Sequence, residues 1–97
     1  MSIEITVRHL EIGDAVKAEA QEKAERLIEK FNDIEFIHIV LDKDGPFFAV
    51  TVAAQGGHNH KIESSGKEPG VREALQDAFE KTETQLRKNT QRMRERK

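Results

Sequence analysis

The stretch IEFIHIVLDKDGPFFAVTVAA, residues 34–54, decides the fold of this chain. Two runs rich in β-branched and aromatic residues, 34–41 and 47–54, stand on either side of Asp44-Gly45-Pro46, a sequence typical of a tight turn. The stretch therefore predicts a β-hairpin in the middle of the chain.

Further strands are expected on both sides of this hairpin. Upstream, Ile3, Ile5 and Val7 alternate with polar residues, which predicts a half-buried strand over residues 3–9. Downstream, Gly56-Gly57 provides a turn, and the polar run HNHKIESS, residues 58–65, predicts a shorter strand at an edge of the sheet.

Two helices complete the pattern. Asp14 stands where an N-cap would, and apolar residues follow it at spacings of three or four up to Phe31. The second helix opens at Pro69-Gly70 and would span about 39 Å if residues 70–95 are all helical. The order β-α-β-β-β-α predicts a single α+β domain, in which a four-stranded, mainly antiparallel sheet has both helices packed on one face.

Length and composition narrow the class of protein. A chain of 97 residues is long enough for one small core, so we expect one domain over residues 1–97. The chain has no cysteine, which excludes disulfides, thiolate zinc sites and a cysteine nucleophile and agrees with a cytoplasmic location. The N-terminal stretch MSIEITVRHLEIGD has no unbroken apolar run, so neither a signal peptide nor a membrane span is expected.

The charge is distributed unevenly along the chain. The last seventeen residues, 81–97, carry seven Lys or Arg against two Glu, whereas the first eighty carry 9 basic and 16 acidic residues. Concentrating the positive charge on one element gives phosphate groups a local binding surface, so nucleic acid is the leading partner class. Residues 90–97 are expected to form a basic, frayed tail.

The basic residues also fall on particular helix faces. At 100° per residue, Lys23, Arg26 and Lys30 share one flank of the first helix, and Lys81, Lys88 and Arg92 share one flank of the second. We expect these two basic lines to border a common groove. Arg8 and His9, at the end of the first strand, would join the same surface.

For the first helix a simpler interpretation stays open. Glu19 and Lys23, like Glu22 and Arg26, are ordinary pairs at i and i+4 on a solvated helix face. Each such pair stabilises a helix by only about 0.2–0.5 kcal/mol and implies no ligand.

Several segments match one protein family, in order along residues 3–90. They are ITVRHLEIGDAV near the start, EKAERLIEKF at the end of the first helix, SGK, and EALQDAFEKTETQLRK in the second helix. With these segments the chain resembles the bacterial ribosome hibernation promoting factors, also called ribosome-associated inhibitor A, light-repressed protein or sigma-54 modulation protein.

The resemblance implies a layout similar to that of double-stranded-RNA-binding domains and a function on the ribosome. Such a protein docks on the small ribosomal subunit through rRNA, lies in the channel used by messenger and transfer RNA, and silences ribosomes under stress or in stationary phase. It would be no enzyme, need no cofactor, small-molecule substrate or membrane, and be a monomer when free. The rRNA-binding residues implied in this sequence are Arg8, His9, Lys23, Arg26, Lys30, Lys81, Arg87, Lys88 and Arg92.

The chain departs from the family pattern in places. Val7 precedes the Arg-His pair where the family often has glycine, and Pro69-Gly70-Val71-Arg72 replaces an acidic-aromatic helix start. Residues 55–61 align poorly. The chain has neither the C-terminal dimerisation domain of the long form nor the acidic tail of the inhibitor type, so we expect the short form.

A metal site is one alternative function. His58 and His60, two residues apart in an alternating strand, would share a face, and His38 on a neighbouring strand could complete a three-histidine site. No signature such as HExxH supports this hypothesis. Residues 64–67, SSGK, lack the frame of a phosphate-binding loop and predict a turn instead.

A protein-interaction module, such as a regulator of a transcription factor, is the other alternative. Phe47 and Phe48 are adjacent in one strand and must point to opposite faces of the sheet, so one of them is expected to be exposed.

Overall fold

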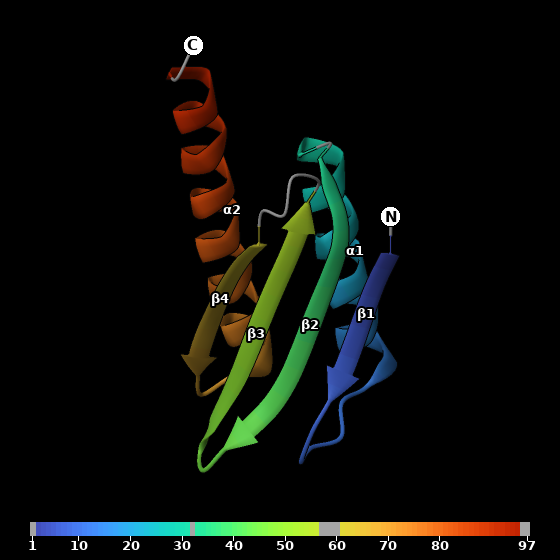
Figure 1. The fold of residues 1–97 in the computed structure, drawn as a ribbon. Coiled ribbons are helices and arrows are strands. Elements are labelled where there is room, and N and C mark those ends of the chain that lie inside the picture. Colours follow the sequence, from blue (N-terminus) through green and yellow to red (C-terminus); the bar gives the residue numbers. More distant parts are fainter. Residues whose placement is uncertain (1, 32, 57–60, 96–97) are drawn as a thin grey trace.

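The computed structural model describes residues 2–31, 33–56 and 61–95, and for residues 89–95 it describes the backbone alone. The elements are β1 (Ser2–Val7), α1 (Asp14–Lys30), β2 (Ile34–Asp44), β3 (Phe47–Gly56), β4 (Lys61–Glu68) and α2 (Val71–Glu95), as Figure 1 shows. The predicted order β-α-β-β-β-α is confirmed. Within the described ranges, no helix is both long and apolar enough to cross a membrane.

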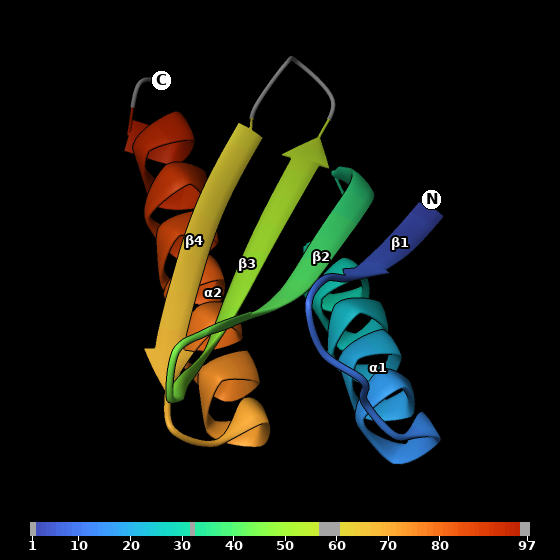
Figure 2. The same cartoon turned by 90° about the horizontal axis from the view of Figure 1, so that it is seen from below.

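The sheet has the strand order β1-β2-β3-β4. β1 and β2 are parallel because α1 returns the chain to the starting end of β1, whereas β2, β3 and β4 form an antiparallel meander. The predicted hairpin is confirmed: Asp44 pairs with Phe47 across Gly45-Pro46, and Gly45 adopts the left-handed conformation that glycine tolerates. Both helices lie on one face of the sheet, so the α+β layout is confirmed (Figure 2).

Two strand boundaries were predicted incorrectly. The fourth strand, predicted over residues 58–65, runs on to Glu68, and its predicted residues 58–60 lie outside the described part of the chain. The turn predicted at residues 64–67 is therefore wrong. The buried positions of this strand are held by Ile62, Ser64 and Gly66, of which only the isoleucine is an obvious core residue. The first strand ends at Val7, because His9 leaves the extended conformation with a φ of 59°.

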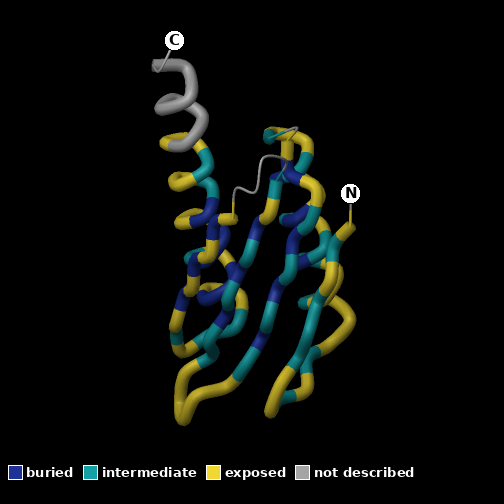
Figure 3. The backbone as a smooth tube through the Cα atoms, in the orientation of Figure 1, coloured by how far each residue is buried: buried dark blue, intermediate teal, exposed yellow. Residues whose placement is uncertain are grey.

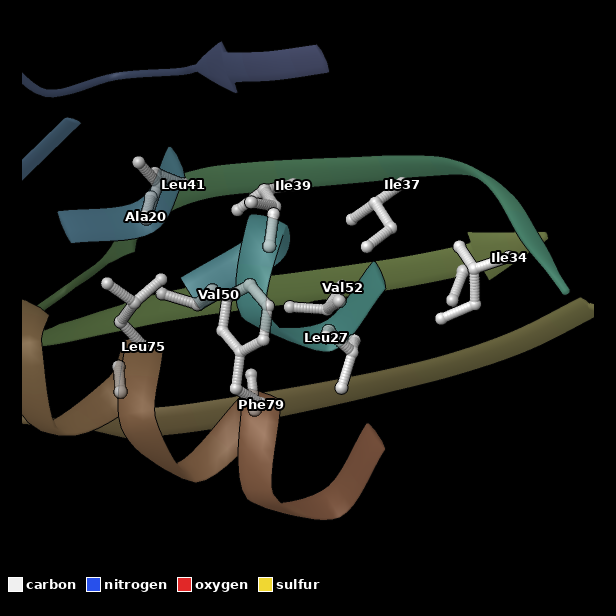
Figure 4. Packing of buried hydrophobic residues seen from close by; sticks show 14 residues of the cluster. Ala20, Leu27, Ile34, Ile37, Ile39, Leu41, Val50, Val52, Leu75 and Phe79 are labelled. Atoms are coloured by element: carbon white, nitrogen blue, oxygen red, sulfur yellow. The ribbon is translucent and has the colours of Figure 1, made fainter. Parts of the chain in front are cut away.

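The core lies between the sheet and the helices. Ile37, Ile39 and Leu41 on β2 and Val50 and Val52 on β3 alternate with more exposed residues and are completely buried against the helices (Figures 3 and 4). Burying a side chain of this kind stabilises the fold by about 1.5–3 kcal/mol. On the helices the buried apolar residues recur at helical spacing, and they are Ala20, Ala24, Leu27, Ala74, Leu75, Ala78 and Phe79.

Gly66 brings α2 unusually close to β4. A Cβ atom at this position would lie 2.6 Å from the carbonyl oxygen of Ala74 and 2.9 Å from the backbone nitrogen of Ala78. Glycine is therefore required for the helix backbone to rest directly on the strand backbone. This contact sets which sides of α2 face β4 and α1.

Candidate nucleic-acid interface

A groove between α1 and α2 is lined by three of the basic side chains of α1. Its volume is about 390 Å³, and Lys23, Arg26 and Lys30 line it from α1. The apolar side chains of Leu27 and Phe79 also line the groove. The prediction that these three basic residues share one surface is confirmed.

Carboxylates of α2 complete the opposite wall of this groove. Glu83 Oε1 lies 3.2 Å from Lys30 Nζ, and Glu83 Oε2 lies 2.6 Å from an Arg87 guanidinium nitrogen, so one carboxylate bridges two cations. Arg26 is paired within α1 to Glu22, at 2.5 Å. The positive charge of the groove is thus partly neutralised, and Arg87 is linked to the groove through Glu83, although it does not itself line it.

Glu83 was not anticipated as part of the interface. Its pairing with Arg87 follows the i, i+4 rule and could have been found in the sequence. Its pairing with Lys30 could not, because that contact depends on how the two helices pack.

Lys81 points away from the groove, toward β4. Its ammonium group donates a hydrogen bond to the Ser65 carbonyl oxygen at 3.0 Å and lies 3.2 Å from an Asp77 carboxylate oxygen. The expectation that both basic lines border one groove is therefore wrong for Lys81. Lys81 thus lies on the β4 side of α2, whereas Glu83 lies on the side that faces α1.

Lys88 continues this second flank two turns further along α2. It is exposed, and in the described part of the chain it has neither a hydrogen bond nor an ion pair. Lys88 is therefore more available to a phosphate group than Lys81. Arg92 lies in α2, but its side chain is outside the described residues, so its predicted role stays a prediction.

Arg8 and His9 lie at the opposite end of the domain from Lys30. They follow β1 just before α1 begins, and α1 separates them from Lys30 by its length, about 25 Å at 1.5 Å per residue. The expectation that they join the helix groove is wrong. They form a separate group at the end of β1, where the Arg8 N–H donates to the Leu41 carbonyl oxygen at 2.8 Å.

His9 is held in place by Asp42. Its Nδ1 lies 2.9 Å from Asp42 Oδ1, and the Lys43 N–H donates to the same oxygen at 2.7 Å. These hydrogen bonds, that of His9 above all, lower the pKa of Asp42 below its ordinary value of 3.8. The contact fixes a left-handed histidine, a conformation that is uncommon outside glycine.

The two alternative functions find limited support. Within residues 2–31, 33–56 and 61–95, no group of three or more His, Cys, Asp or Glu could hold a metal ion. His58 and His60 lie outside these ranges, so the three-histidine site stays a prediction. Phe47 is 39% exposed while Phe48 packs against the core, as predicted, but Lys67 Nζ lies 5.7 Å from the centre of the Phe47 ring.

Comparisons with known proteins agree with this architecture. Residues 3–94 match the family described as sigma 54 modulation protein / S30EA ribosomal protein. No curated protein sequence matches the chain at a significant level.

Two solved structures share the fold. A ribosomal subunit interface protein from Coxiella burnetii has a TM-score of 0.85 and 21% identity over 93% of this chain and 98% of its own. The N-terminal domain of Thermus thermophilus Protein Y has a TM-score of 0.79 and 23% identity over 91% of this chain and 98% of its own.

Proposed function

Because the chain belongs to the sigma 54 modulation protein / S30EA ribosomal protein family, we propose that it associates with the ribosome and inhibits translation without enzymatic chemistry. The proposed partner is the rRNA of the small subunit. The bound domain would occupy the channel used by messenger and transfer RNA when cells enter stress or stationary phase, in the cytoplasm.

The α1–α2 groove is the observation that carries this proposal. Lys23, Arg26 and Lys30 lie along one wall, and Arg87 of the facing helix is paired to Glu83, which lines the opposite wall. Folded RNA presents rows of phosphates that Lys and Arg can contact without reading bases, and the shape of the RNA determines the place of binding. A rigid surface with several cations suits this kind of recognition.

The carboxylates beside the groove determine which basic side chains must exchange a partner when RNA binds. Lys30, Arg26 and Arg87 are exposed and paired to Glu22 or Glu83, and exposed pairs of this kind are worth only about 0–1 kcal/mol. Phosphate oxygens can therefore replace the carboxylates as partners. Lys23 has no such partner to exchange among the residues with described side chains, so we assign it the first contact.

Ribosome association of two charge-matched variants tests this function. In the Lys23→Glu/Arg26→Glu variant two groove cations are reversed, and we expect the protein to leave the small-subunit fractions of a sucrose gradient. The Lys43→Glu/Lys61→Glu variant makes the same change in net charge on side chains that do not line the groove, and it should co-sediment like the wild type.

The result must be obtained with folded proteins, which circular dichroism and thermal unfolding establish. Equal co-sedimentation of the two folded variants would reject the groove as the binding surface. Absence of the wild-type protein from every ribosomal fraction of starved cells, at low and high potassium, would reject the proposed function itself.

A further inference from the structure

The two edge strands of the sheet, β4 and β1, differ in the hydrogen bonds that the rest of the chain makes to them. At the β4 edge, the Lys81 side chain of α2 donates a hydrogen bond to the Ser65 carbonyl oxygen of the strand. At the β1 edge, no side chain or loop in the described ranges hydrogen-bonds to the outer side of the strand. An uncovered edge offers unpaired N–H and C=O groups to another strand.

A single hydrogen bond shows to which side the backbone N–H and C=O groups of each β1 residue point. The Arg8 N–H points to β2, where it donates to Leu41, so Thr6 and Glu4 also direct their backbone groups toward β2. Ile3, Ile5 and Val7 therefore direct their N–H and C=O groups outward. β1 has neither a proline nor a bulge in its pairing with β2, so nothing in the strand blocks this edge.

A groove lies beside this edge, on the helix side of the sheet. Its volume is about 310 Å³, and Ile3 of β1 and Gln21, Glu25 and Ile28 of α1 line it. Lys17, one turn before Gln21, is exposed on the same flank of α1. The flank therefore carries a cation at one end and a carboxylate at the other.

We propose that a second copy of this chain pairs with β1 in antiparallel orientation, across a twofold axis at Ile5, to form one continuous sheet. In this register Ile5 faces its own copy, and Ile3 faces Val7, so every outward backbone group finds a partner. Glu4 then lies opposite Thr6. A register centred on Glu4 would instead place two carboxylates opposite each other, which is unfavourable.

The helices also fit this arrangement. α1 packs over both β1 and β2, so strands about 4.8 Å apart would bring the two copies of α1 to about 10 Å, within the usual range for packed helices. Ile3 lies level with Gln21, Glu25 and Ile28 of α1, because all four line the groove beside β1. Ile5 lies about 7 Å further along β1, toward the start of α1, so the twofold axis passes close to Gln21. Lys17 and Glu25 are four residues to either side of Gln21. Each Lys17 therefore faces Glu25 of the second copy.

The proposed dimer leaves the α1–α2 groove open and does not rest on the proposed function. It replaces the monomer expected from the sequence. Sedimentation equilibrium from micromolar to millimolar concentration measures its dissociation constant. A wild-type chain that stays monomeric over this range overturns the proposal and leaves the edge to an extended segment of another protein.

Charge reversal tests the orientation. The Lys17→Glu variant turns two symmetric attractions into repulsions and should weaken dimerisation about 10-fold or more. The swapped Lys17→Glu/Glu25→Lys variant should restore it, whereas Lys61→Glu, the same charge change on β4, should have no effect. Equal dissociation constants for wild type and Lys17→Glu, or a swap that restores nothing, would overturn the orientation.

A covalent trap provides an independent measurement. The natural chain has no cysteine, so the Gln21→Cys variant carries a single thiol close to the proposed axis. A short bismaleimide should link two copies of this variant and should not link the Lys61→Cys variant. Equal yields of linked dimer from the two variants, or none from Gln21→Cys, would contradict the proposal.

Discussion

Glu83 on α2 holds Lys30 of α1 at 3.2 Å through one carboxylate oxygen, while its other oxygen lies 2.6 Å from Arg87. One acidic side chain thus connects the two helices and is ion-paired to two basic side chains. In the proposed complex, phosphate oxygens would take its place. Glu83 is therefore an internal competitor of the RNA, and its removal should strengthen binding rather than weaken it.

Replacing Glu83 with glutamine is expected to raise the affinity for small-subunit rRNA. Lys30 and Arg87 lose their charged partner, so their positive charge becomes available to phosphate. The free energy of unfolding should fall by less than about 1 kcal/mol, because exposed ion pairs contribute little. Filter binding at several salt concentrations measures the affinity. Glu35→Gln, the same change on an exposed residue of β2, is the control, and an equal gain in both variants would show a net-charge effect alone.

Alanine substitutions of Lys81 and Lys88 should have different effects, the first on the free energy of unfolding and the second on RNA affinity. Lys81→Ala removes the hydrogen bond to the Ser65 carbonyl oxygen and should lower the free energy of unfolding by about 0.5–1 kcal/mol. Lys88→Ala should leave stability unchanged and lower RNA affinity. Urea unfolding and filter binding of both variants give the comparison. Equal stability of the two variants would contradict the structural role of Lys81.

Gly66→Ala should destabilise the domain through α2. Its new methyl group would lie 2.6 Å from the Ala74 carbonyl oxygen, so the helix must move away from β4, at a cost of about 1–3 kcal/mol. Gly13→Ala is the control for added bulk, because no atom lies within 4 Å of a Cβ there, and only the small loss of replacing glycine at the N-cap of α1 is expected. Thermal unfolding should show a clearly lower midpoint for Gly66→Ala only. A midpoint equal to that of Gly13→Ala would mean that the helix does not rest on the strand backbone.

The contact between His9 and Asp42 predicts a pH dependence of stability. Because the folded-state pKa of Asp42 is lowered, its contribution is fully present above the ordinary value of 3.8 and is lost as the pH falls through the lower, folded-state pKa. Wild type should therefore exceed Asp42→Asn in stability at neutral pH, and the difference should shrink in acid. Urea unfolding across the acid range measures it. A difference that grows as the pH falls would contradict the assignment, and Glu11→Gln, an exposed loop change, serves as control.

Most of the fold could be predicted because its core residues are apolar and recur with the correct period. The hairpin and both helices have this pattern in full. The end of β4 was predicted incorrectly because Ser64 and Gly66 occupy its buried positions, and neither residue gives the apolar pattern of a strand. Their burial depends on the distant α2: Gln85 donates to the Ser64 hydroxyl at 2.9 Å, and the helix backbone rests on Gly66.

The candidate interface could be predicted only in part, for a related reason. Helical periodicity was sufficient to place Lys23, Arg26 and Lys30 on one flank of α1. The rotation of α2 about its own axis was not contained in that pattern, because the close approach at Gly66 sets it. Lys81 consequently faces β4, and Glu83 faces α1.

The parallel pairing of β1 with β2 has a consequence for the order in which the domain assembles. β2, β3, β4 and α2 are neighbours both along the chain and in space, whereas Ser2 must find Phe36 across the whole of α1. Closing that long loop costs chain entropy before any contact compensates it. The N-terminal strand should therefore be added last during folding, and its amide protons should be the first of the sheet to exchange with deuterium from solvent.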